Sequence, residues 1–372
     1  MVHSEEGKVL VTLASSASTP GDVLRVHGLG ALPCTLLEGA GLINRTWAVG
    51  RPPRYALQQV NALFPAAVHE RVAAVTDHLA LRGLDTPRLV RAPGGAPAIP
   101  GPDGTSWRLL TWVDGITFDR VPSPAHARRA AALVARFHAA LADAPFDLTP
   151  LRPHAHDTAL HMARLREALD ACGGHRLARG IRATGAEILL AWGRFQARIA
   201  WPDLPSRPSH GDLKISNVRF DPAGEEAVCL IDLDTLGRLP LPVELGDALR
   251  SWCNRGGEDA ASAVFDEDTF VAASQGYLSA AVGLEPEEVA ALPAGVLRIA
   301  LELAARFCAD AFHECYFGWD PARAPGRSEH ALLRACGQAA LAAQVEARLD
   351  VLGDRMRTGW RPPPTRLGPT GA

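Results

Sequence analysis

The sequence is nearly free of lysine. It has 38 lysine and arginine residues among 372, yet only Lys8 and Lys214 are lysines. We attribute this bias to codon composition rather than to chemistry. A lysine retained against such a background indicates a place where a compact ammonium is favoured over the planar fork of arginine. For Lys214 the alternative is a residue kept by chance on a solvated loop.

The sequence also lacks an excess of positive charge and a long apolar run. Its net charge is -3, whereas a nucleic-acid binder needs a basic patch that releases counterions. No apolar stretch approaches the roughly 20 residues of a membrane span. The N-terminus lacks the basic-then-apolar layout of a signal peptide. We therefore expect a cytoplasmic protein whose partners include neither nucleic acid nor a membrane.

Paired cysteines are missing as well. The seven cysteines are scattered, odd in number and without a Cys-x-x-Cys pair. This distribution is typical of reduced thiols and argues against a disulfide framework or a zinc ribbon. With 47% hydrophobic and 21% charged residues, the chain has the composition of a globular protein. It is long enough for two lobes with separate cores.

One polar segment, residues 209–217 (Ser-His-Gly-Asp-Leu-Lys-Ile-Ser-Asn), carries the strongest functional signal. Asp212 and Asn217 have the separation found in kinase catalytic loops, and Asp232 follows the next strand-like run, as a second metal-binding Asp does. Phosphoryl transfer needs a carboxylate that receives the acceptor's proton and oxygen ligands for Mg²⁺. We assign the first role to Asp212 and the second to Asn217 and Asp232.

Lys214 follows the proposed catalytic Asp by two residues. An ammonium at this position would face the γ-phosphate, where it could stabilise charge on the transferred group. The alternative for the whole segment is an Asx-rich turn that caps its own backbone. That interpretation leaves the second acidic cluster, directly after an apolar run, without an explanation.

Upstream of this segment the sequence predicts five strands and one helix. The strands are short runs bounded by turn residues, and the helix has apolar residues at helical spacing without Pro or Gly. The predicted strands are 35–38, 46–49, 54–60, 87–90 and 107–112, and the predicted helix is 66–81. The Pro- and Gly-rich stretch 92–104 is interpreted as a hairpin loop. This is the layout of a kinase N-terminal lobe.

From residue 124 onward the sequence predicts mostly helix. We therefore expect an α+β, bilobal, protein-kinase-like fold: a small five-stranded antiparallel N-lobe with one helix, and a larger, mainly helical C-lobe. The predicted parts are a lead-in, the nucleotide-binding N-lobe, the C-lobe with catalytic loop and acceptor site, and a disordered tail. Their ranges are 1–22, 23–114, 115–360 and 361–372.

Nucleotide contacts are expected from the N-lobe. Gly39, Gly41 and Asn44 lie where a phosphate-covering loop belongs, and glycines allow backbone N–H groups to approach phosphates. A plain hairpin turn is the alternative. The phosphate-binding lysine of kinase strands is missing, and Gln58 stands in that region.

Thr111 and Val113 end the last predicted strand, where adenine would meet backbone groups; apolar packing is the alternative. Glu70, on the predicted helix, could pair with an arginine such as Arg54 or be solvated.

Several stretches resemble a known family. His210, Asp212, Asn217 and Asp232 resemble the aminoglycoside phosphotransferase and choline kinase family. Further segments resemble, more narrowly, its N-acetylhexosamine 1-kinase group. These segments are 41–47, 55–61, 156–158, 229–235, 245–250, 306–307 and 316–317.

This resemblance implies ATP- and Mg²⁺-dependent phosphorylation of the anomeric hydroxyl of N-acetylglucosamine or N-acetylgalactosamine. It also implies an amino-sugar site, and its residues would be His156, Asp157, Arg306 and Tyr316. Each of the four could instead be a helix cap or an inter-helix hydrogen bond.

Two further assignments concern acidic residues after the motif. Asp234 is an alternative metal ligand, although a structural role is favoured for it. Asp247 and Arg250 are interpreted as a structural pair one helical turn apart that supports the catalytic loop.

Two rival functions remain open. One is a kinase for another acceptor, such as an aminoglycoside, choline or homoserine. A polycationic acceptor would need a cluster of carboxylates, and the acidic segments 258–259 and 266–268 are candidates, although helix starts would explain them equally. The other is a nucleotide-binding pseudokinase. The presence of Asp212, Asn217 and Asp232 argues against it, because a protein without catalysis has no chemical need for all three.

Overall fold

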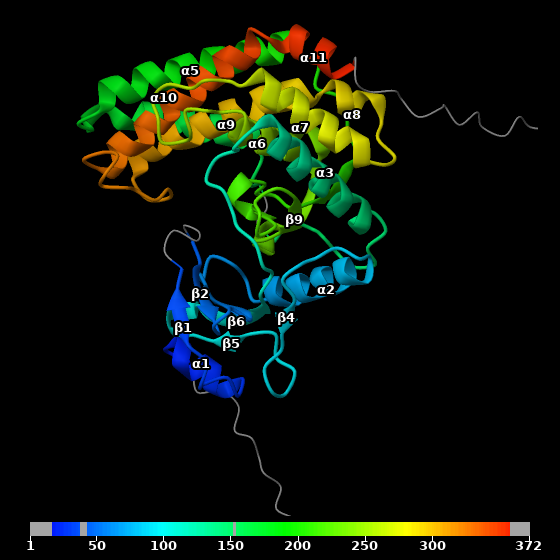
Figure 1. Ribbon diagram of the computed structural model, residues 1–372. Helices are drawn as coiled ribbons and strands as arrows, with labels where there is room; N and C mark the ends of the chain where they lie inside the picture. The colour runs from blue at the N-terminus through cyan, green and yellow to red at the C-terminus, as the bar shows by residue number, and fades with distance from the viewer. Residues whose placement is uncertain (1–16, 38–42, 152–153, 358–372) are drawn as a thin grey trace, which may run out of the picture. The chain divides into compact units, whose positions relative to one another are not determined.

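The computed structural model describes most of the chain (Figure 1). The described residues are 17–37, 43–151 and 154–357. Gly39, Gly41 and the predicted tail 361–372 lie outside them, so those predictions stay as they are. The chain divides into two compact units. The first comprises Met1–Asp77 and Pro87–Val113, and the second comprises His78–Thr86 and Asp114–Ala372.

The first unit is built on one antiparallel sheet. Its strands are β1 (Cys34–Leu36), β2 (Arg45–Val49), β3 (Tyr55–Val60), β4 (Leu89–Val90), β5 (Ile99–Pro100) and β6 (Ser106–Thr111). The strand order is β1-β2-β3-β6-β4, and β5 also pairs with β6. The sheet thus has one strand more than the five predicted. β5 lies inside the predicted hairpin loop and has only two residues, because Pro100 has no N–H with which to extend the ladder.

The two faces of this sheet differ sharply. Trp47, Leu57 and Trp107 belong to a buried apolar cluster that includes Val23 and Leu24 from helix α1 (Pro20–Val26). Neighbouring residues along a strand point to opposite faces. The residues next to these three in the sequence therefore present polar side chains on the other face. Those side chains belong to Thr46, Gln58 and Arg108.

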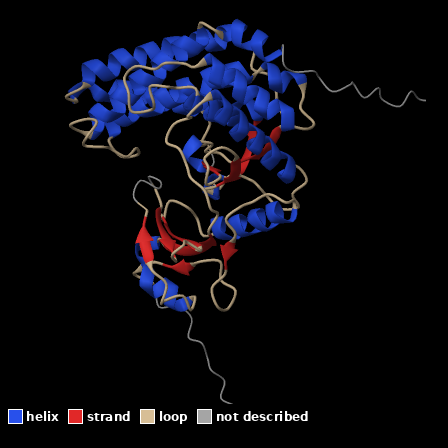
Figure 2. Cartoon of the chain, in the orientation of Figure 1, coloured by secondary structure: helices blue, strands red, loops and turns tan. Residues whose placement is uncertain are grey.

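The second unit is mainly helical, with two small antiparallel sheets of two strands each (Figure 2). Its helices are α3 (Pro124–Leu141), α4 (Thr158–Ala171), α5 (Ala178–Arg198), α6 (Leu241–Trp252), α7 (Glu267–Ala280), α8 (Pro286–Ala290), α9 (Leu292–His313), α10 (Arg327–Glu346) and α11 (Leu349–Arg357). One sheet pairs β7 (Ser206–Ser209) with β10 (Gly237–Pro240), and the other is a hairpin of β8 (Val218–Phe220) and β9 (Ala227–Leu230). Helix α2 (Ala67–Leu81) has residues in both units. In the part of the chain that the structure describes, no helix is long and apolar enough to cross a membrane.

Helix α9 is the central helix of the second unit and packs against α4, α5, α6 and α10. Most of its side chains are buried and apolar. Arg298, Glu302, Arg306 and Asp310 interrupt this pattern at every fourth residue, so their side chains share one face of the helix. Glu302 and Asp310 are nevertheless buried, with 1% and 6% exposure. Buried carboxylates require partners, and those partners belong to the candidate active site.

Candidate active site

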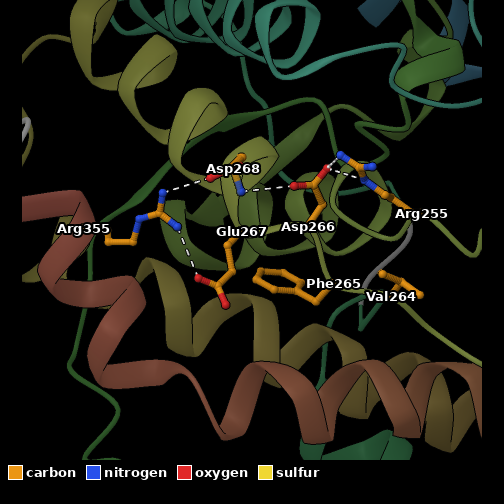
Figure 3. A pocket seen from close by; sticks show the side chains of 7 residues that line it. All are labelled: Arg255, Val264, Phe265, Asp266, Glu267, Asp268 and Arg355. Carbon is orange, nitrogen blue, oxygen red and sulfur yellow. Dashed lines mark hydrogen bonds and ion pairs between the residues drawn. The ribbon is translucent and has the colours of Figure 1, made fainter.

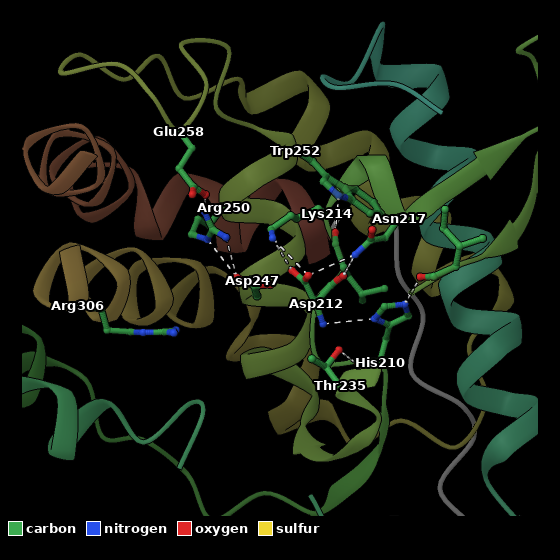
Figure 4. A network of polar contacts seen from close by, with 12 residues as sticks. His210, Asp212, Lys214, Asn217, Thr235, Asp247, Arg250, Trp252, Glu258 and Arg306 are labelled. Atoms are coloured by element: carbon green, nitrogen blue, oxygen red, sulfur yellow. Dashed lines mark hydrogen bonds and ion pairs between the residues drawn. The ribbon is translucent and has the colours of Figure 1, made fainter. Parts of the chain in front are cut away.

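The catalytic loop predicted from the sequence connects β7 to β8. Its central pair is Asp212 and Lys214, whose Nζ lies 3.3 Å from both carboxylate oxygens of Asp212. The Asp212 side chain lies between Lys214 and Asn217 (Figure 4). Both side chains of the pair are partly exposed, 26% for Asp212 and 42% for Lys214. The loop therefore presents a carboxylate and an ammonium together to a substrate.

The two predicted metal ligands lie at one end of the β8–β9 hairpin. The backbone N–H of Ile231 donates to the carbonyl of Asn217 at 2.9 Å, so Asp232 directly follows the residue paired with Asn217. Nδ2 of Asn217 donates to the Asp212 carbonyl at 2.8 Å, which leaves Oδ1 as the atom suited to a cation. Asp232 has a left-handed backbone conformation with φ of 64°, which is uncommon outside glycine and recurs at active sites.

This donor set fits Mg²⁺. Among the described residues, no group of three or more His, Cys, Asp or Glu side chains could hold a metal by itself. Mg²⁺ is typically bound by one or two carboxylates together with substrate phosphates and water. An amide oxygen and a carboxylate at one hairpin end correspond to that mode. Asp234, the alternative ligand, is 3% exposed, which favours its structural role.

Helix α6 holds the catalytic loop through residues that the sequence did not identify. The buried carboxylate of Glu244 accepts hydrogen bonds from the backbone N–H groups of His210, at 2.7 Å, and Gly211, at 3.1 Å. At the other end of the helix, Nε1 of Trp252 donates to the carbonyl of Leu213 at 2.7 Å. These bonds fix the main chain on both sides of Asp212. The sequence signal for Glu244 was a lone carboxylate in an apolar helical run.

The residue before Asp212 must be glycine in this geometry. Gly211 has φ of 82°, a left-handed conformation that residues with a Cβ rarely adopt. A Cβ built on it would also lie 2.5 Å from the Thr235 carbonyl oxygen. Thr235 itself donates from Oγ1 to the carbonyl of His210 at 2.8 Å. The close approach of these two segments fixes where the loop places Asp212.

The predicted pair of Asp247 and Arg250 is present. Arg250 donates to Oδ1 of Asp247 from Nε at 3.1 Å and from Nη2 at 2.8 Å. Its Nη1 donates to Glu258 at 3.0 Å. Burial disfavours the charged form of Lys214, but the carboxylates of Asp212, Glu258 and Asp247 outweigh it and raise the pKa of Lys214. Lys214 is therefore a full cation at neutral pH.

Two of the predicted acceptor residues lie at the start of α4. Nδ1 of His156 is 3.1 Å from Oε1 of Glu302 on α9. Burial opposes protonation, yet the hydrogen bond and charge of Glu302 raise the pKa of His156. Asp157 is the N-cap of α4 and accepts from the N–H of Leu160 at 3.0 Å. The helix-cap alternative thus describes Asp157.

Arg306 and Tyr316, the other two predicted acceptor residues, are in contact. Nη2 of Arg306 donates to the Tyr316 hydroxyl at 3.3 Å, and its guanidinium lies 5.5 Å from the Tyr316 ring centre. Figure 4 shows Arg306 extending toward Asp247 and Asp212. The Tyr316 side chain is half-exposed. Both residues can therefore reach a bound molecule on this side of the loop.

Asp310 fixes the loop that carries Tyr316. Its Oδ1 accepts from the N–H groups of Cys315, at 3.1 Å, and Tyr316, at 2.9 Å. Its Oδ2 accepts from the N–H of Phe317 at 2.9 Å. One buried carboxylate thus satisfies three successive amides after the end of α9. The sequence did not identify this residue.

Two of the residues predicted to contact the nucleotide in the first unit, Asn44 and Thr111, make hydrogen bonds within the protein. Oδ1 of Asn44 accepts from the N–H of Asn61 at 3.0 Å, which ties β2 to β3. Oγ1 of Thr111 accepts from the N–H of Arg88 at 2.8 Å. The Thr111 N–H donates to the Arg88 carbonyl at 2.8 Å, so that amide is not available to adenine. Val113, partly exposed, stays a prediction.

Glu70 has an arginine partner, which is one of the two predicted alternatives. Glu70 pairs with Arg91, at 3.0 and 2.7 Å, rather than with Arg54. Both side chains of this pair are about half exposed. Gln58 makes hydrogen bonds to two neighbouring strands, through Nε2 to Thr46 at 3.3 Å and through Oε1 to Arg108 at 2.8 Å.

A pocket of about 380 Å³ lies at the start of α7, and none of the candidate active-site residues lines it (Figure 3). Its acidic residues are already paired. Asp266 caps α7 and binds Arg255, while Asp268 binds Arg355. Glu267 binds Arg348 and Arg355. The segment 266–268 is thus a helix start with arginine partners.

The model of the phosphotransferase enzyme family matches residues 37–281, which is well over half of the chain. The chain belongs to the phosphotransferase enzyme family. This match confirms the predicted family. It also confirms the prediction that this phosphotransferase is an ATP-dependent enzyme that acts on an alcohol group.

Solved structures share its fold. An aminoglycoside phosphotransferase from Alicyclobacillus acidocaldarius is 19% identical, with a TM-score of 0.58 over 94% of this chain and 99% of that one. A microcompartment-associated aminopropanol kinase is 17% identical, with a TM-score of 0.60 over 90% and 98%. A choline/ethanolamine kinase family protein from Mesorhizobium loti is 16% identical, with a TM-score of 0.52 over 91% and 100%. These similarities confirm the α+β kinase-like fold of this phosphotransferase.

Proposed function

We propose that this phosphotransferase transfers the γ-phosphoryl group of Mg-ATP to the anomeric hydroxyl of an N-acetylhexosamine. The observation that carries the acceptor class is Arg306, which extends toward Asp212 (Figure 4) and donates to the Tyr316 hydroxyl. The nucleotide is supported by relatives of the same fold, one of which is an amicoumacin kinase in complex with AMP-PNP and Ca²⁺.

The residues of the loop supply the phosphotransfer chemistry. Asp212 orients the acceptor hydroxyl and receives its proton as the bond to phosphorus forms. Lys214, held beside it as a cation, stabilises negative charge on the transferred group. Asn217 and Asp232 would hold Mg²⁺, which neutralises phosphate charge and fixes the geometry of the phosphates.

The charges near the proposed acceptor site favour a neutral acceptor with oxygen groups. Arg306 is a donor-only side chain, and the raised pKa of His156 favours the form in which both of its ring nitrogens donate. Glu302, which contacts both, is the carboxylate that faces them. An acetamido carbonyl and ring hydroxyls accept hydrogen bonds from such donors. A cationic amine would meet repulsion from Arg306.

The rival acceptors carry cationic nitrogen groups, and a site that binds such groups would need unpaired carboxylates. The acidic segments suggested for that role are engaged. Glu258 pairs with Arg250 at 3.0 Å. Asp259 pairs with His330 at 3.0 Å and with Arg334 at 2.5 Å. Residues 266–268 pair with Arg255, Arg348 and Arg355, the first and last of which are drawn in Figure 3. This pairing supports the amino-sugar proposal over an aminoglycoside or choline.

The test is ADP release from Mg-ATP with a panel of N-acetylhexosamines, plain hexoses, choline, homoserine and aminoglycosides. We expect turnover with N-acetylglucosamine or N-acetylgalactosamine. The reducing end of the sugar should lose its reactivity at the same time, because the anomeric hydroxyl becomes phosphorylated. The Asp212→Asn enzyme is the control and should release ADP about 10²- to 10⁴-fold more slowly. Turnover with an amine alone would discard the sugar assignment but keep the catalytic loop. No ADP release with any acceptor would favour the pseudokinase.

A further inference from the structure

Helix α6 carries a second buried carboxylate, Asp247, about one turn after Glu244. Residues three apart share one face of a helix, and Glu244 binds the catalytic loop from this face. Asp247 therefore lies on the side of α6 that meets the loop, and Figure 4 shows it between Arg250 and Asp212. Only 8% of Asp247 is exposed, so each of its two oxygens should have a polar partner.

The two carboxylate oxygens of Asp247 differ in this respect. Oδ1 accepts both of the hydrogen bonds from Arg250. No group within residues 17–37, 43–151 and 154–357 donates a hydrogen bond to Oδ2. A buried carboxylate oxygen without a partner is costly. A ligand that brings a donor to Oδ2 would remove this cost.

We propose that Oδ2 of Asp247 accepts a hydrogen bond from the phosphoryl acceptor. The donor is a hydroxyl or amide N–H other than the hydroxyl that is phosphorylated. This inference rests on the proposed function, because it adds one contact to the same acceptor site. Asp247 is then a substrate-binding residue in addition to its structural role as the partner of Arg250.

The charges near Asp247 come from both sides of the site. Burial opposes the charge of this carboxylate, but the charges of Arg250, His156 and Lys214 outweigh it and lower its pKa. Asp247 is therefore ionised at neutral pH, and an ionised carboxylate only accepts hydrogen bonds. Lys214 belongs to the catalytic loop, whereas His156 lies at the start of α4. The carboxylate thus lies where the loop and the proposed acceptor side meet.

The charges around Asp247 favour a neutral donor over a cation. Figure 4 labels three cations and three carboxylates, so their charges balance. The cations are Lys214, Arg250 and Arg306, and the carboxylates are Asp212, Asp247 and Glu258. Ring hydroxyls and an acetamido N–H are neutral donors. Arg306, which extends toward Asp247, is donor-only, so the two side chains bind opposite hydrogen-bonding groups of one acceptor molecule.

The test is the KM for the acceptor in Asp247→Asn, measured with the acceptor that the ADP-release panel identifies. The amide oxygen can keep the bonds from Arg250, while an NH₂ group replaces the open oxygen. We expect the KM for the acceptor to rise by about 10- to 100-fold, the range for a lost hydrogen bond to a charged group. The KM for ATP and kcat should change little. An unchanged KM for the acceptor would overturn the proposal.

Glu258→Gln is the matched control, because Glu258 pairs with the same arginine. It also removes one carboxylate charge, but Figure 4 shows Glu258 on the far side of Arg250 from Asp212. We expect this variant to keep the wild-type KM for the acceptor. Equal rises in the two variants would mean that Asp247 acts only through Arg250, and they would overturn the proposal.

Analogues of N-acetylglucosamine identify the donor. Each analogue lacks one hydroxyl or carries a methyl group on the amide nitrogen. The analogue without the donor should have a raised KM with the wild type but no further rise with Asp247→Asn, as in a double-mutant cycle. The absence of any such analogue would overturn the proposal.

The wild type tests the proposal even if Asp247→Asn fails to fold. Fluorine cannot donate a hydrogen bond, so replacing the donor hydroxyl by fluorine should raise the KM as much as removing it. Fluorine that restores the KM at every position, together with an unaffected N-methyl analogue, would overturn the proposal. If only an amine is turned over, the N-acetylhexosamine proposal fails, but the KM for that amine in Asp247→Asn still decides the role of Asp247. No turnover with any acceptor would overturn both proposals.

Discussion

The catalytic loop and the acceptor side of the second unit are built in opposite ways. In the loop, Asp212 and Asn217 are five residues apart in the chain, and α6 holds the loop through backbone groups. On the acceptor side, side chains meet across long stretches of sequence: His156 and Glu302 are 146 residues apart. The loop depends on a local motif, whereas the acceptor side depends on how helices pack.

This difference has a chemical consequence. Bonds to backbone N–H and C=O groups survive many changes of the residues that they hold, so the loop can keep its shape while sequences diverge. Contacts between side chains change with each substitution. The phosphoryl-transfer motif can therefore be recognised at low sequence identity, while the acceptor specificity that we propose depends on a few side chains on α9 and at the start of α4.

The most damaging substitution removes the proposed proton acceptor and keeps the shape of the catalytic loop. For Asp212→Asn we expect kcat to fall by about 10²- to 10⁴-fold, because the proton acceptor is lost. ADP affinity and the unfolding temperature should hardly change, since the amide fills the same space. Steady-state kinetics and ADP titration check both parts. A kcat near the wild-type value would remove Asp212 from catalysis.

The second variant weakens the hydrogen bonds from the catalytic loop to Glu244. Glu244→Gln replaces one acceptor oxygen by a donor that faces a backbone N–H. We expect the free energy of unfolding to fall by about 2 kcal/mol, and kcat to fall with it because Asp212 is displaced. Chemical denaturation and kinetics measure these effects.

Glu225→Gln is the control for Glu244→Gln. Its carboxylate is exposed and lies 3.6 Å from Arg129, so we expect a change of less than about 0.5 kcal/mol. Equal stability of the two variants would mean that Glu244 does not hold the loop.

A third variant tests the acceptor side alone. Asp310→Asn weakens the support of the loop that carries Tyr316, because the amide nitrogen cannot accept from a backbone N–H. We expect the KM for the acceptor to rise by about 10-fold, the effect of one to two lost hydrogen bonds, with an unchanged KM for ATP. Asp320→Asn, a change in the nearby exposed turn, is the control. A parallel rise of both KM values would contradict this separation.

The smallest effect is the pH dependence of the His156–Glu302 pair. Burial opposes both charges, but each partner favours the other: the pKa of His156 is raised from 6.5 and that of Glu302 is lowered from 4.5. The His156 contribution to stability is present below pH 6.5 and lost as pH rises through the raised pKa. The Glu302 contribution is present above pH 4.5 and lost as pH falls through the lowered pKa.

Unfolding temperatures of the wild type and of His156→Gln, measured at about pH 6 and pH 9, test this sign. The wild type should have the larger advantage at the lower pH. Glu302→Gln should lose that dependence, because it removes the partner that raises the histidine pKa. An advantage that grows with pH would contradict the assignment.

The sequence predicted the catalytic loop and the strands of the first unit because their signals are local. The separation of Asp212 and Asn217 and the short runs around Trp47 and Leu57 needed no knowledge of distant contacts. Strand β5 was missed, since two residues carry no pattern. Helix α1 was missed as well: residues 1–22 were interpreted as a lead-in, and the local signal of α1 is its capping box of Thr19 and Asp22. The kinase-like family followed from the local motif.

Most of the residues that the sequence missed depend on long-range packing, although Asp310 binds amides only five to seven residues further along the chain. Glu244, Glu302 and Asp310 each interrupt an apolar helical run, and that interruption marks a buried carboxylate without naming its partner. The pairing of Gln58 with Arg108 requires the register of β3 with β6. A single sequence contains the residues of such pairs but not the geometry that joins them.

The scarcity of lysine makes the loop an unusually clean place for labelling. Reagents specific for amines have two lysine side chains to modify, Lys8 and Lys214, and Nζ of Lys214 lies 3.3 Å from Asp212. Reductive methylation with ¹³C would therefore place one spectroscopic reporter beside the proposed proton acceptor without any mutation. Its raised pKa calls for alkaline labelling conditions, and bound nucleotide should protect it.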